Sequence, residues 1–297
     1  MSIKFKQASM SKNKIFVLYL MVITLSTLVS CSDPIPWPAS PLYNFENSHE
    51  LTSITTNIDS VKQLLVGHYA HYDVVAYEDT TTQSPMFTFV ISYGFTDYFL
   101  DSLGNLIQSD RFLFAEHKIN QPNIKSTFNS DAVQAIKPKN QQVELNYHDG
   151  NWHIYRAPTP SLLGIKGDPS LPLSTDPNDP NITDPDNDGN PGVTVQINIG
   201  KFIEGFIYIT RREIYANYLT LNNDGTLTGY VKDDSEQFVV GASRRILAQE
   251  SNAYQHPDKG LNPILLVPVS DEIDTLEELF EIRDEIFPKE PEFIKID

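Results

Sequence analysis

The alternation of apolar and polar positions is most regular in the second half of the chain. Residues 193–199 alternate without interruption, and residues 202–211 continue the pattern. A period of two predicts half-buried β-strands, with one face on a core and the other in solvent. The segments 215–221 and 226–231 flank the residues 222–225 (Asn-Asn-Asp-Gly), which predicts a tight hairpin. Two further strands are predicted in this half, at 238–243 and 264–269.

The first half is also patterned as strands. Residues 64–77 are rich in aromatic and β-branched side chains, and a short helical turn at 59–65 is expected to precede the strand. The sequence His-Asp-Gly-Asn at 148–151 predicts a second hairpin. The other strands predicted in this half are 86–93, 97–100, 111–117, 143–147 and 152–155.

One longer helix is predicted near the end of the chain, over residues 271–287. Ser270 can cap its first turn, and Pro288 stops it. Its apolar residues fall close to helical spacing: Ile273, Leu276, Leu279, Phe280, Ile282 and Ile286. We expect this helix to cover one end of a sheet, and residues 288–297 to form a tail.

These patterns predict a mainly β protein made of two antiparallel β-meander halves, either lipocalin-like or sandwich-like. The N-terminal half spans 58–157 and the C-terminal half spans 193–270. The loop 158–192, rich in Pro and Asp, joins the two halves. Whether they form one sheet system or two is left open by the sequence.

The N-terminal segment carries the pattern of an export signal. Residues 1–14 contain four Lys and no acid, and residues 15–29 form an apolar run of signal-peptide length. Cys31 follows Leu-Val-Ser and is the sole cysteine. This ending resembles the lipobox of bacterial lipoproteins. The resemblance implies that residues 1–30 are a signal peptide and that Cys31 is acylated.

The same resemblance implies a location and a partner. A Ser at position 32 is compatible with transfer to the outer membrane of a Gram-negative envelope, and two or three acyl chains suffice for stable anchoring. Residues 31–57, with closely spaced prolines, are predicted to be a tether above the membrane, although Trp37, Tyr43 and Phe45 could pack back on the body.

Charge narrows the choice of partners. The sequence has 22 basic and 39 acidic residues, a formal charge of −17. Removing residues 1–30 removes four Lys and no acid, which leaves 18 basic residues against 39 acidic ones, or −21. An acidic body disfavours binding to nucleic acid and favours cations.

The best candidate chemistry lies in the joining loop, because no Lys or Arg occurs between Lys166 and Lys201. Asp184, Asp186 and Asp188 alternate before a glycine, the spacing with which Ca²⁺ loops gather side-chain oxygens around a sharp turn. We therefore predict a Ca²⁺ site at these three residues. Asn190 can offer a further oxygen.

The pattern departs from an EF-hand, because position twelve of the loop is Val195 where a bidentate Glu is expected. No flanking helix is predicted, so the loop is closer to the helix-free Ca²⁺ loops of thrombospondin type 3 repeats. Asp176 or Asp179 could complete the ligand shell. The alternative is a solvated acidic linker, since Asp, Asn, Pro and Gly also favour turns.

Other chemistry is weakly indicated. His68 and His71 lie three apart on a predicted strand and should point to opposite faces, which disfavours a shared metal. The sequence Gly-Ala-Ser-Arg-Arg at 241–245 lacks the final Gly of a nucleophile elbow, and we find no phosphate-binding loop and no dinucleotide fingerprint.

The segment 186–195 carries a second resemblance, because its Asp-Gly-Asn-Pro-Gly-Val-Thr-Val sequence is similar to that of a family of uncharacterised exported proteins, known mainly from deltaproteobacteria and relatives. Further similar residues occur as Ile207, Tyr208, Arg211, Glu236, Gln237, 241–243, 256–258, Arg283, Asp284, Phe287 and Pro288. This resemblance, over roughly 184–288, implies a β-rich exported protein and no particular activity.

Together these observations lead us to expect a lipid-anchored, non-enzymatic envelope protein that binds a ligand or a protein partner and has a calcium-ordered loop. Two alternatives stay open. One is a hydrolase of envelope glycans or lipids that uses two carboxylates as acid and base. The other is a lipocalin-like carrier in which each half is a small barrel that holds an apolar ligand.

Overall fold

The computed structural model describes residues 35–45, 55–80, 85–121, 123–128, 130–137, 139–201, 203–248 and 252–294. The predicted signal peptide and Cys31 lie outside these ranges. Among the described helices, none combines the length and the hydropathy that a bilayer crossing requires.

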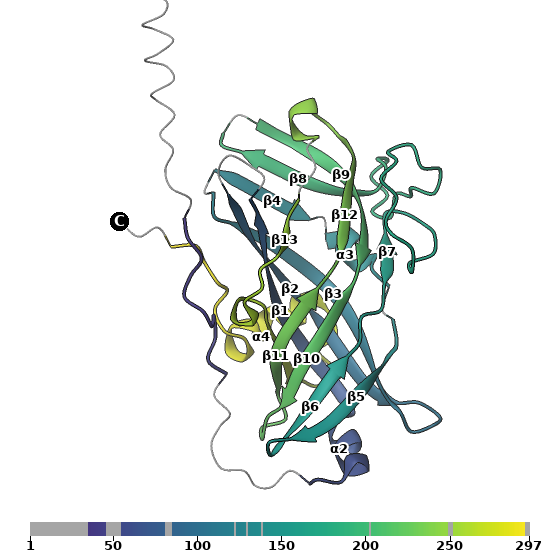
Figure 1. Ribbon diagram of the computed structural model, residues 1–297, viewed down its shortest axis with the longest axis vertical. Coiled ribbons are helices and arrows are strands. Elements are labelled where there is room, and N and C mark those ends of the chain that lie inside the picture. The colour runs from purple at the N-terminus through teal and green to yellow at the C-terminus, as the bar shows by residue number, and fades with distance from the viewer. Residues whose placement is uncertain are drawn as a thin grey trace, which may run out of the picture. The chain divides into compact units, whose positions relative to one another are not determined.

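The prediction of a mainly β, antiparallel fold with a short C-terminal helix is confirmed (Figure 1). The described strands are β1 Gly67–Asp79, β2 Met86–Leu100, β3 Leu106–Ile119, β4 Ile124–Phe128, β5 Gln141–His148, β6 Asn151–Arg156, β7 Ser161–Leu163, β8 Val193–Ile199, β9 Ile203–Glu213, β10 Tyr215–Leu221, β11 Leu227–Asp233, β12 Glu236–Ala242, β13 Tyr254–Gln255 and β14 Pro263–Pro268. The described helices are α2 Ile58–Leu65, α3 Ser130–Gln134 and α4 Leu276–Ile286, with the short 3₁₀ turns η1 Arg245–Leu247 and η2 Lys259–Leu261.

Eight of the strands close into a ring in the order β3-β2-β1-β14-β11-β10-β6-β5. The ring closes because β5 pairs with the start of β3, where Ile107 faces Gln142. Further along β3, Glu116 faces Thr127 of β4 instead, and the sheet continues from β4 through β8 and β9 to β12. The long strand β3 therefore belongs to both the ring and its extension.

The two predicted halves interleave in this single sheet. Strand β1 of the first half pairs with β14 of the second, β6 pairs with β10, and β4 pairs with β8. Residues Ile35–Asp297 accordingly form one compact unit. The question that the sequence left open is answered: the halves form one sheet system.

Strand β2 is one continuous strand, where the sequence predicted two segments, 86–93 and 97–100. The polar stretch between them looks like a break, but Thr96 faces inward and donates a hydrogen bond to Asp110 at 2.8 Å. Gly94 is required for close strand contact, because a Cβ there would overlap the carbonyl oxygen of Arg111. Gly94 and Thr96 are therefore buried positions within one continuous strand and do not break it.

The C-terminal helix begins later than predicted. Helix α4 starts at Leu276, and Thr275 caps it in place of Ser270. The Thr275 hydroxyl accepts from the backbone N–H of Glu278, whose carboxylate accepts from the N–H of Thr275 in return. This reciprocal capping box satisfies two helix-end donors, which a lone serine at position 270 cannot do.

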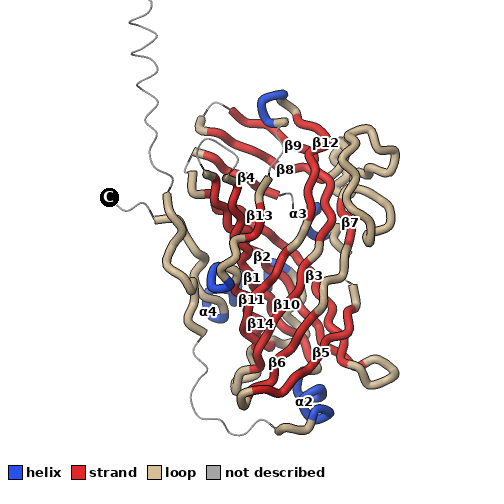
Figure 2. Tube along the Cα trace, in the orientation of Figure 1, coloured by secondary structure: helices blue, strands red, loops and turns tan. Residues whose placement is uncertain are grey.

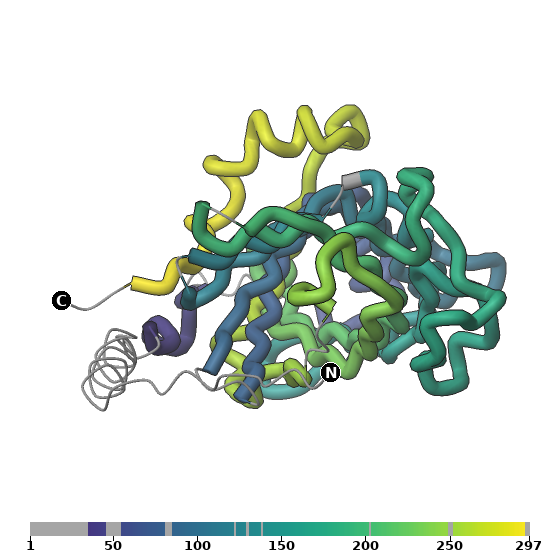
Figure 3. Tube along the Cα trace, turned by 90° about the horizontal axis from the view of Figure 1, so that it is seen from above, coloured from purple at the N-terminus to yellow at the C-terminus, as the bar shows by residue number. Residues whose placement is uncertain are grey.

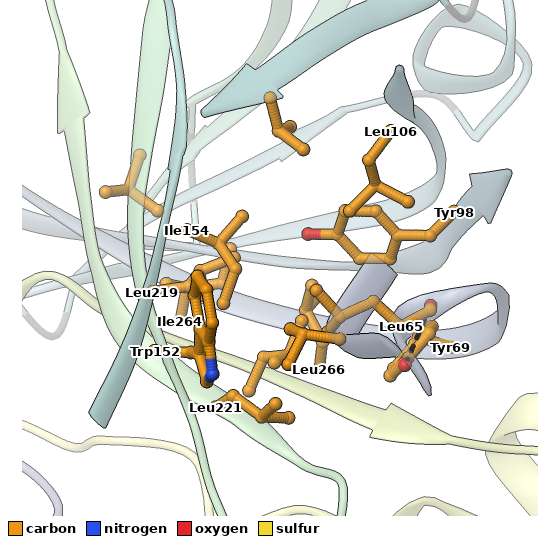
Figure 4. Close-up of a cluster of buried hydrophobic side chains, with 14 of the residues drawn as sticks. Leu65, Tyr69, Tyr98, Leu106, Trp152, Ile154, Leu219, Leu221, Ile264 and Leu266 are labelled. Atoms are coloured by element: carbon orange, nitrogen blue, oxygen red, sulfur yellow. Dashed lines mark hydrogen bonds between the residues drawn. The ribbon is translucent and has the colours of Figure 1, made fainter. Parts of the chain in front are cut away.

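The interior of the ring holds one apolar cluster (Figure 4). Its labelled members come from α2 and from six of the ring strands: Leu65, Tyr69, Tyr98, Leu106, Trp152, Ile154, Leu219, Leu221, Ile264 and Leu266. Helix α2 lies beside the β5–β6 end of the ring (Figure 2). This end of the ring is thus filled with side chains.

A second cluster covers the outer face of β1 and β2. Helix α4 packs there through Leu279 and Phe280, and it lies outside the strands when the protein is seen from above (Figure 3). Residues 35–45 of the predicted tether pack on the same face. Trp37 stacks on Phe87, with ring centroids 5.0 Å apart, and donates a 2.8 Å hydrogen bond to Glu78. The aromatic residues in this part of the tether belong to the folded body.

Candidate functional site

The loop that contains the three alternating aspartates has a defined conformation. It is closed by a 2.7 Å hydrogen bond from Gly192 N–H to the carbonyl of Thr183, and Thr183 N–H donates to Gly164 at 2.9 Å. Asn187 and Gly189 take positive φ angles of 56° and 85°, which turn the chain sharply. The loop therefore starts and ends at fixed points against the sheet, directly before β8.

Asp184, Asp186 and Asp188 come together as predicted. Each offers one carboxylate oxygen, and these oxygens all lie within 4.8 Å of one another, so the group could hold a metal ion. Both oxygens of Asp184 accept from backbone donors, Gly189 N–H at 2.9 Å and Asp188 N–H at 3.2 Å. Asp188 accepts from Asn190 N–H at 2.8 Å and from the Thr194 hydroxyl. These bonds fix the orientation of the two carboxylates.

Asp186 is the central member of this group. It is only 7% exposed, and its Oδ2 accepts a 2.9 Å hydrogen bond from Thr194 N–H. Its Oδ1 is buried without a hydrogen-bond partner. Burial raises the pKa of Asp186, and the negative charge of Asp188 raises it further. The hydrogen bond from Thr194 N–H lowers the pKa but does not cancel the effect of burial. A buried carboxylate oxygen without a donor is energetically costly, and a cation would satisfy it.

The other predicted ligands are placed differently. Asn190 lies in the loop with its backbone N–H on Asp188, and its role as a ligand stays a prediction. Asp176 and Asp179 accept hydrogen bonds from Asn178 and Asn181 in turns of their own, and neither belongs to the group of three.

A second candidate site is a cavity of about 120 Å³ that the sequence did not reveal. It lies among strands β1–β4, β7, β9–β11 and helix α3. Its lining is mostly apolar: Val75, Val90, Phe112, Ala115, Phe128, Ala132, Val133, Ile136, Leu163, Tyr215 and Val231. Polar side chains contribute the remainder: Asp73, Tyr77, Ser92, His117, Arg211, Glu213 and Asp233. A mostly apolar space with a few converging polar groups is typical of a small-ligand site.

Arg211 and Glu213 form an ion pair at the cavity wall. Arg211 Nε donates to Glu213 at 2.6 Å, and a second guanidinium nitrogen donates to the other carboxylate oxygen at 3.2 Å. A third contact, at 2.8 Å, ties Arg211 to Gln237. Burial alone would raise the pKa of Glu213, but the charge and hydrogen bonds of Arg211 lower it. Both side chains keep some exposure, 20% and 15%.

Asp233 lies beside this pair and has no cationic partner of its own among the described ion pairs. It accepts hydrogen bonds from Tyr77 at 2.6 Å and from the Ser235 hydroxyl at 2.7 Å. Burial and the neighbouring charge of Glu213 raise the pKa of Asp233. The pKa values of the two carboxylates are thus shifted in opposite directions, that of Glu213 downward and that of Asp233 upward.

His117 is the one histidine on the cavity wall. Its Nδ1 lies 2.9 Å from the Ser126 hydroxyl. Burial, with the charge of Arg211 as a smaller cause, lowers the pKa of His117 to about 4. The imidazole is therefore neutral near pH 7 and adds no charge to the cavity.

The histidines considered from the sequence have structural partners. His71 lies inside the ring, with Nε2 2.8 Å from Asp73 and Nδ1 2.8 Å from Thr96. His68 contacts Asp97 at 2.6 Å and the carbonyl of Ile273 at 3.0 Å. Neither belongs to the candidate metal-binding group of Asp184, Asp186 and Asp188 found among the described residues.

An outer cleft of about 500 Å³ adjoins the cavity. The two spaces share Tyr77, Val231 and Asp233, so these residues form the wall between them. The cleft is also lined by Tyr230 and by residues of the 252–262 segment. The hydrogen bond from Tyr77 to Asp233 therefore lies at the boundary between the cavity and the cleft.

Sequence reasoning missed the cavity, although a signal was present. Arg211, Glu213 and Tyr215 alternate along β9 and β10 and point to one face, where apolar residues are expected if that face meets a packed core. Charged residues at such positions indicate either a solvent face or an internal polar site. Only the strand pairing distinguishes the two.

No family model matches this chain, and searches of curated proteins and of solved structures found no match. The resemblances to bacterial lipoproteins and to the exported family stay predictions from the sequence.

Proposed function

We propose that this protein is a lipid-anchored, non-enzymatic component of the cell envelope that holds a small ligand in its central cavity. The cavity among β1–β4, β7, β9–β11 and α3 carries this proposal. Its lining combines apolar walls with converging polar groups, the usual composition of ligand sites. The lipid anchor rests on the lipobox around Cys31 and on the acid-free basic N-terminus.

The loop of Asp184, Asp186 and Asp188 has a separate role in the proposal, as a Ca²⁺ site that orders the segment before β8. The support is the buried, unpartnered Oδ1 of Asp186 among carboxylates within 4.8 Å. Oxygen-only donors suit a hard cation, and Ca²⁺ tolerates irregular geometry better than Mg²⁺ does. Protein carboxylates and water would complete the coordination.

A titration tests ligand binding. The probe is 3-methylbutan-1-ol, a neutral compound of suitable size, added to the chain from residue 32 onward and followed by NMR shifts of the cavity residues. We expect Ala115→Leu to abolish the shifts, because Ala115 lines the cavity. Ala39→Leu makes the same enlargement at an exposed position and should leave them unchanged. Shifts that survive Ala115→Leu would place binding elsewhere.

A hydrolase remains the second candidate, because Glu213 and Asp233 converge on the cavity. The Ser235 hydroxyl lies 3.2 Å from Glu213 and 2.7 Å from Asp233. Carboxylates with divergent pKa values are the pattern of an acid and base pair. Against catalysis, both oxygens of Glu213 are engaged by Arg211. Turnover of a glycan or ester substrate that Asp233→Asn abolishes would establish the hydrolase.

A further inference from the structure

We infer that the ligand of the central cavity is a compact organic cation: a short apolar body with one protonated amino group, which lies against the carboxylate of Asp233. This inference rests on the proposed ligand-binding function and specifies the chemical class of the ligand. It follows from the balance of charges on the cavity wall, from the size of the cavity and from the position of Asp233.

Of the three carboxylates that line the cavity, Asp233 is the one with no ion-pair partner among the described residues. Glu213 is paired with Arg211, and Asp73 lies 2.8 Å from His71 Nε2, an ion pair when His71 is protonated. His117 is neutral. Asp233 is held by the hydroxyls of Tyr77 and Ser235 and by the Ser235 N–H at 3.1 Å, but it takes part in no described ion pair. The charge of Arg211 also acts on Asp233, but Arg211 is already paired with Glu213, so this half-buried carboxylate attracts a further positively charged group.

The same wall disfavours the other ligand charges. Arg211 is the guanidinium on this wall. Three of its five N–H donors are directed to Glu213 and Gln237, and Glu213 balances its charge, which disfavours an anionic ligand. A hard metal ion needs several oxygen ligands, and most of the lining is apolar. A neutral ligand fits the apolar walls but leaves Asp233 without a counter-charge.

Volume sets the size of the ligand. The cavity of about 120 Å³ is slightly smaller than the apolar cavity of about 150 Å³ that holds benzene in a well-studied case. We therefore expect about five or six non-hydrogen atoms. Val75, Val90 and Ala115 supply apolar contact for the carbon atoms.

The position of Asp233 gives a cation a path from the outer cleft into the cavity. Tyr77 and Asp233 line both the cavity and the outer cleft of about 500 Å³. An amine in the cleft meets the Asp233 carboxylate before it reaches the apolar walls.

The experiment compares three probes that share one branched five-carbon skeleton at pH 7: 3-methylbutylamine, 3-methylbutan-1-ol and 3-methylbutanoate. Affinities are measured by NMR titration or calorimetry on the chain from residue 32 onward, which contains the whole unit Ile35–Asp297. We expect the amine to bind about tenfold or more tightly than the alcohol, as a charge-assisted hydrogen bond in a buried site gives. The carboxylate should bind more weakly than the alcohol.

Variants assign this preference to Asp233. Asp233→Asn should reduce the affinity for the amine to that for the alcohol. Asp234→Asn is the matched control, because that carboxylate is 63% exposed and pairs with Lys232. Tyr77→Phe keeps the negative charge and should keep the preference for the amine.

The outcomes separate the two proposals. If the alcohol binds and Ala115→Leu blocks it, but the amine binds no better, the ligand-binding function stands and the cationic class is wrong. If the preference for the amine survives in Asp233→Asn, the assignment to this carboxylate is wrong. If none of the three probes binds, both proposals are refuted. The comparison of probes on the unmodified protein needs no variant to fold.

Discussion

Removing calcium should lower the melting temperature of this protein, because the loop before β8 holds three carboxylates close together. Their facing oxygens lie within 4.8 Å of one another. Two unit charges at that separation repel by about 3 kcal/mol at an effective dielectric constant of about 20, before solvent screening of the exposed Asp188. Hydrogen bonds from Thr194, Gly189 and Asn190 offset part of this repulsion, but Asp186 Oδ1 receives none.

The expected gain follows from the affinity. A loop without the bidentate Glu of an EF-hand should bind Ca²⁺ with a dissociation constant on the order of 10⁻⁴ to 10⁻³ M, as extracellular modules do. At about 10 mM Ca²⁺, binding to the folded state alone adds roughly 1.4 to 2.7 kcal/mol. For a chain of this size, about 2–4 °C per kcal/mol corresponds to an increase in Tm of roughly 3 to 11 °C.

The assay is thermal unfolding of the chain from residue 32 onward, followed by circular dichroism, in 10 mM calcium chloride (about 100 times the tighter dissociation constant) and in chelator at equal ionic strength. The double variant Asp186→Ala, Asp188→Ala should melt at the same temperature in both buffers. The matched control Asp176→Ala, Asp179→Ala makes an equal charge change outside the group and should keep the response to calcium. Identical melting curves for the unmodified protein in the two buffers would refute the calcium site and leave a solvated acidic loop.

Three further predictions test other parts of the molecule. The folded protein keeps His117 neutral, since burial lowers its pKa to about 4, whereas the unfolded chain binds a proton near pH 6.5. Stability is therefore unaffected by this residue above pH 6.5 and falls as the pH is lowered from 6.5 toward 4. His117→Gln should therefore remove about 3 kcal/mol of the stability lost between pH 7 and pH 4 in urea unfolding, whereas replacing the exposed His148 should not. Gly94→Ala should destabilise the protein by about 1–3 kcal/mol through overlap with the facing strand, and Gly241→Ala, which meets only the edge of a tyrosine ring at 3.3 Å, should cost less. Cys31→Ser should abolish incorporation of labelled palmitate and release the protein from the membrane fraction; unchanged labelling would show that Cys31 is not the lipidated residue.

The local features of the fold were readable from the sequence because they depend on short-range chemistry. Strands β8 and β10 match the predicted ranges 193–199 and 215–221, because an apolar and polar alternation of period two suits only an extended chain with one buried face. The aspartate loop gathers its carboxylates as predicted, since its glycines and short spacing act within ten residues. The capping box of Thr275 and Glu278 is also visible in the sequence, so the prediction of Ser270 as the cap is wrong although it too rests on short-range chemistry.

The central cavity could not be read in this way. Its polar residues come from strands that are distant in sequence, with Tyr77 in β1 and Asp233 in β11 brought to 2.6 Å. An alternating strand pattern shows which residues share a face, but it does not show which other strand that face meets. For the same reason, the sequence did not predict that the pairing of β3 with β5 closes the ring.

The sequence by itself determined the mainly β class, most strand positions, the C-terminal helix and the grouping of Asp184, Asp186 and Asp188. The tertiary structure alone decided that both halves form one sheet, that residues 35–45 pack on it, and that Arg211, Glu213 and Asp233 line a cavity. The physical reason is the range of the interactions. Backbone propensity, turn chemistry and capping act over a few neighbouring residues, whereas strand pairing and the burial of charge depend on contacts between segments more than a hundred residues apart.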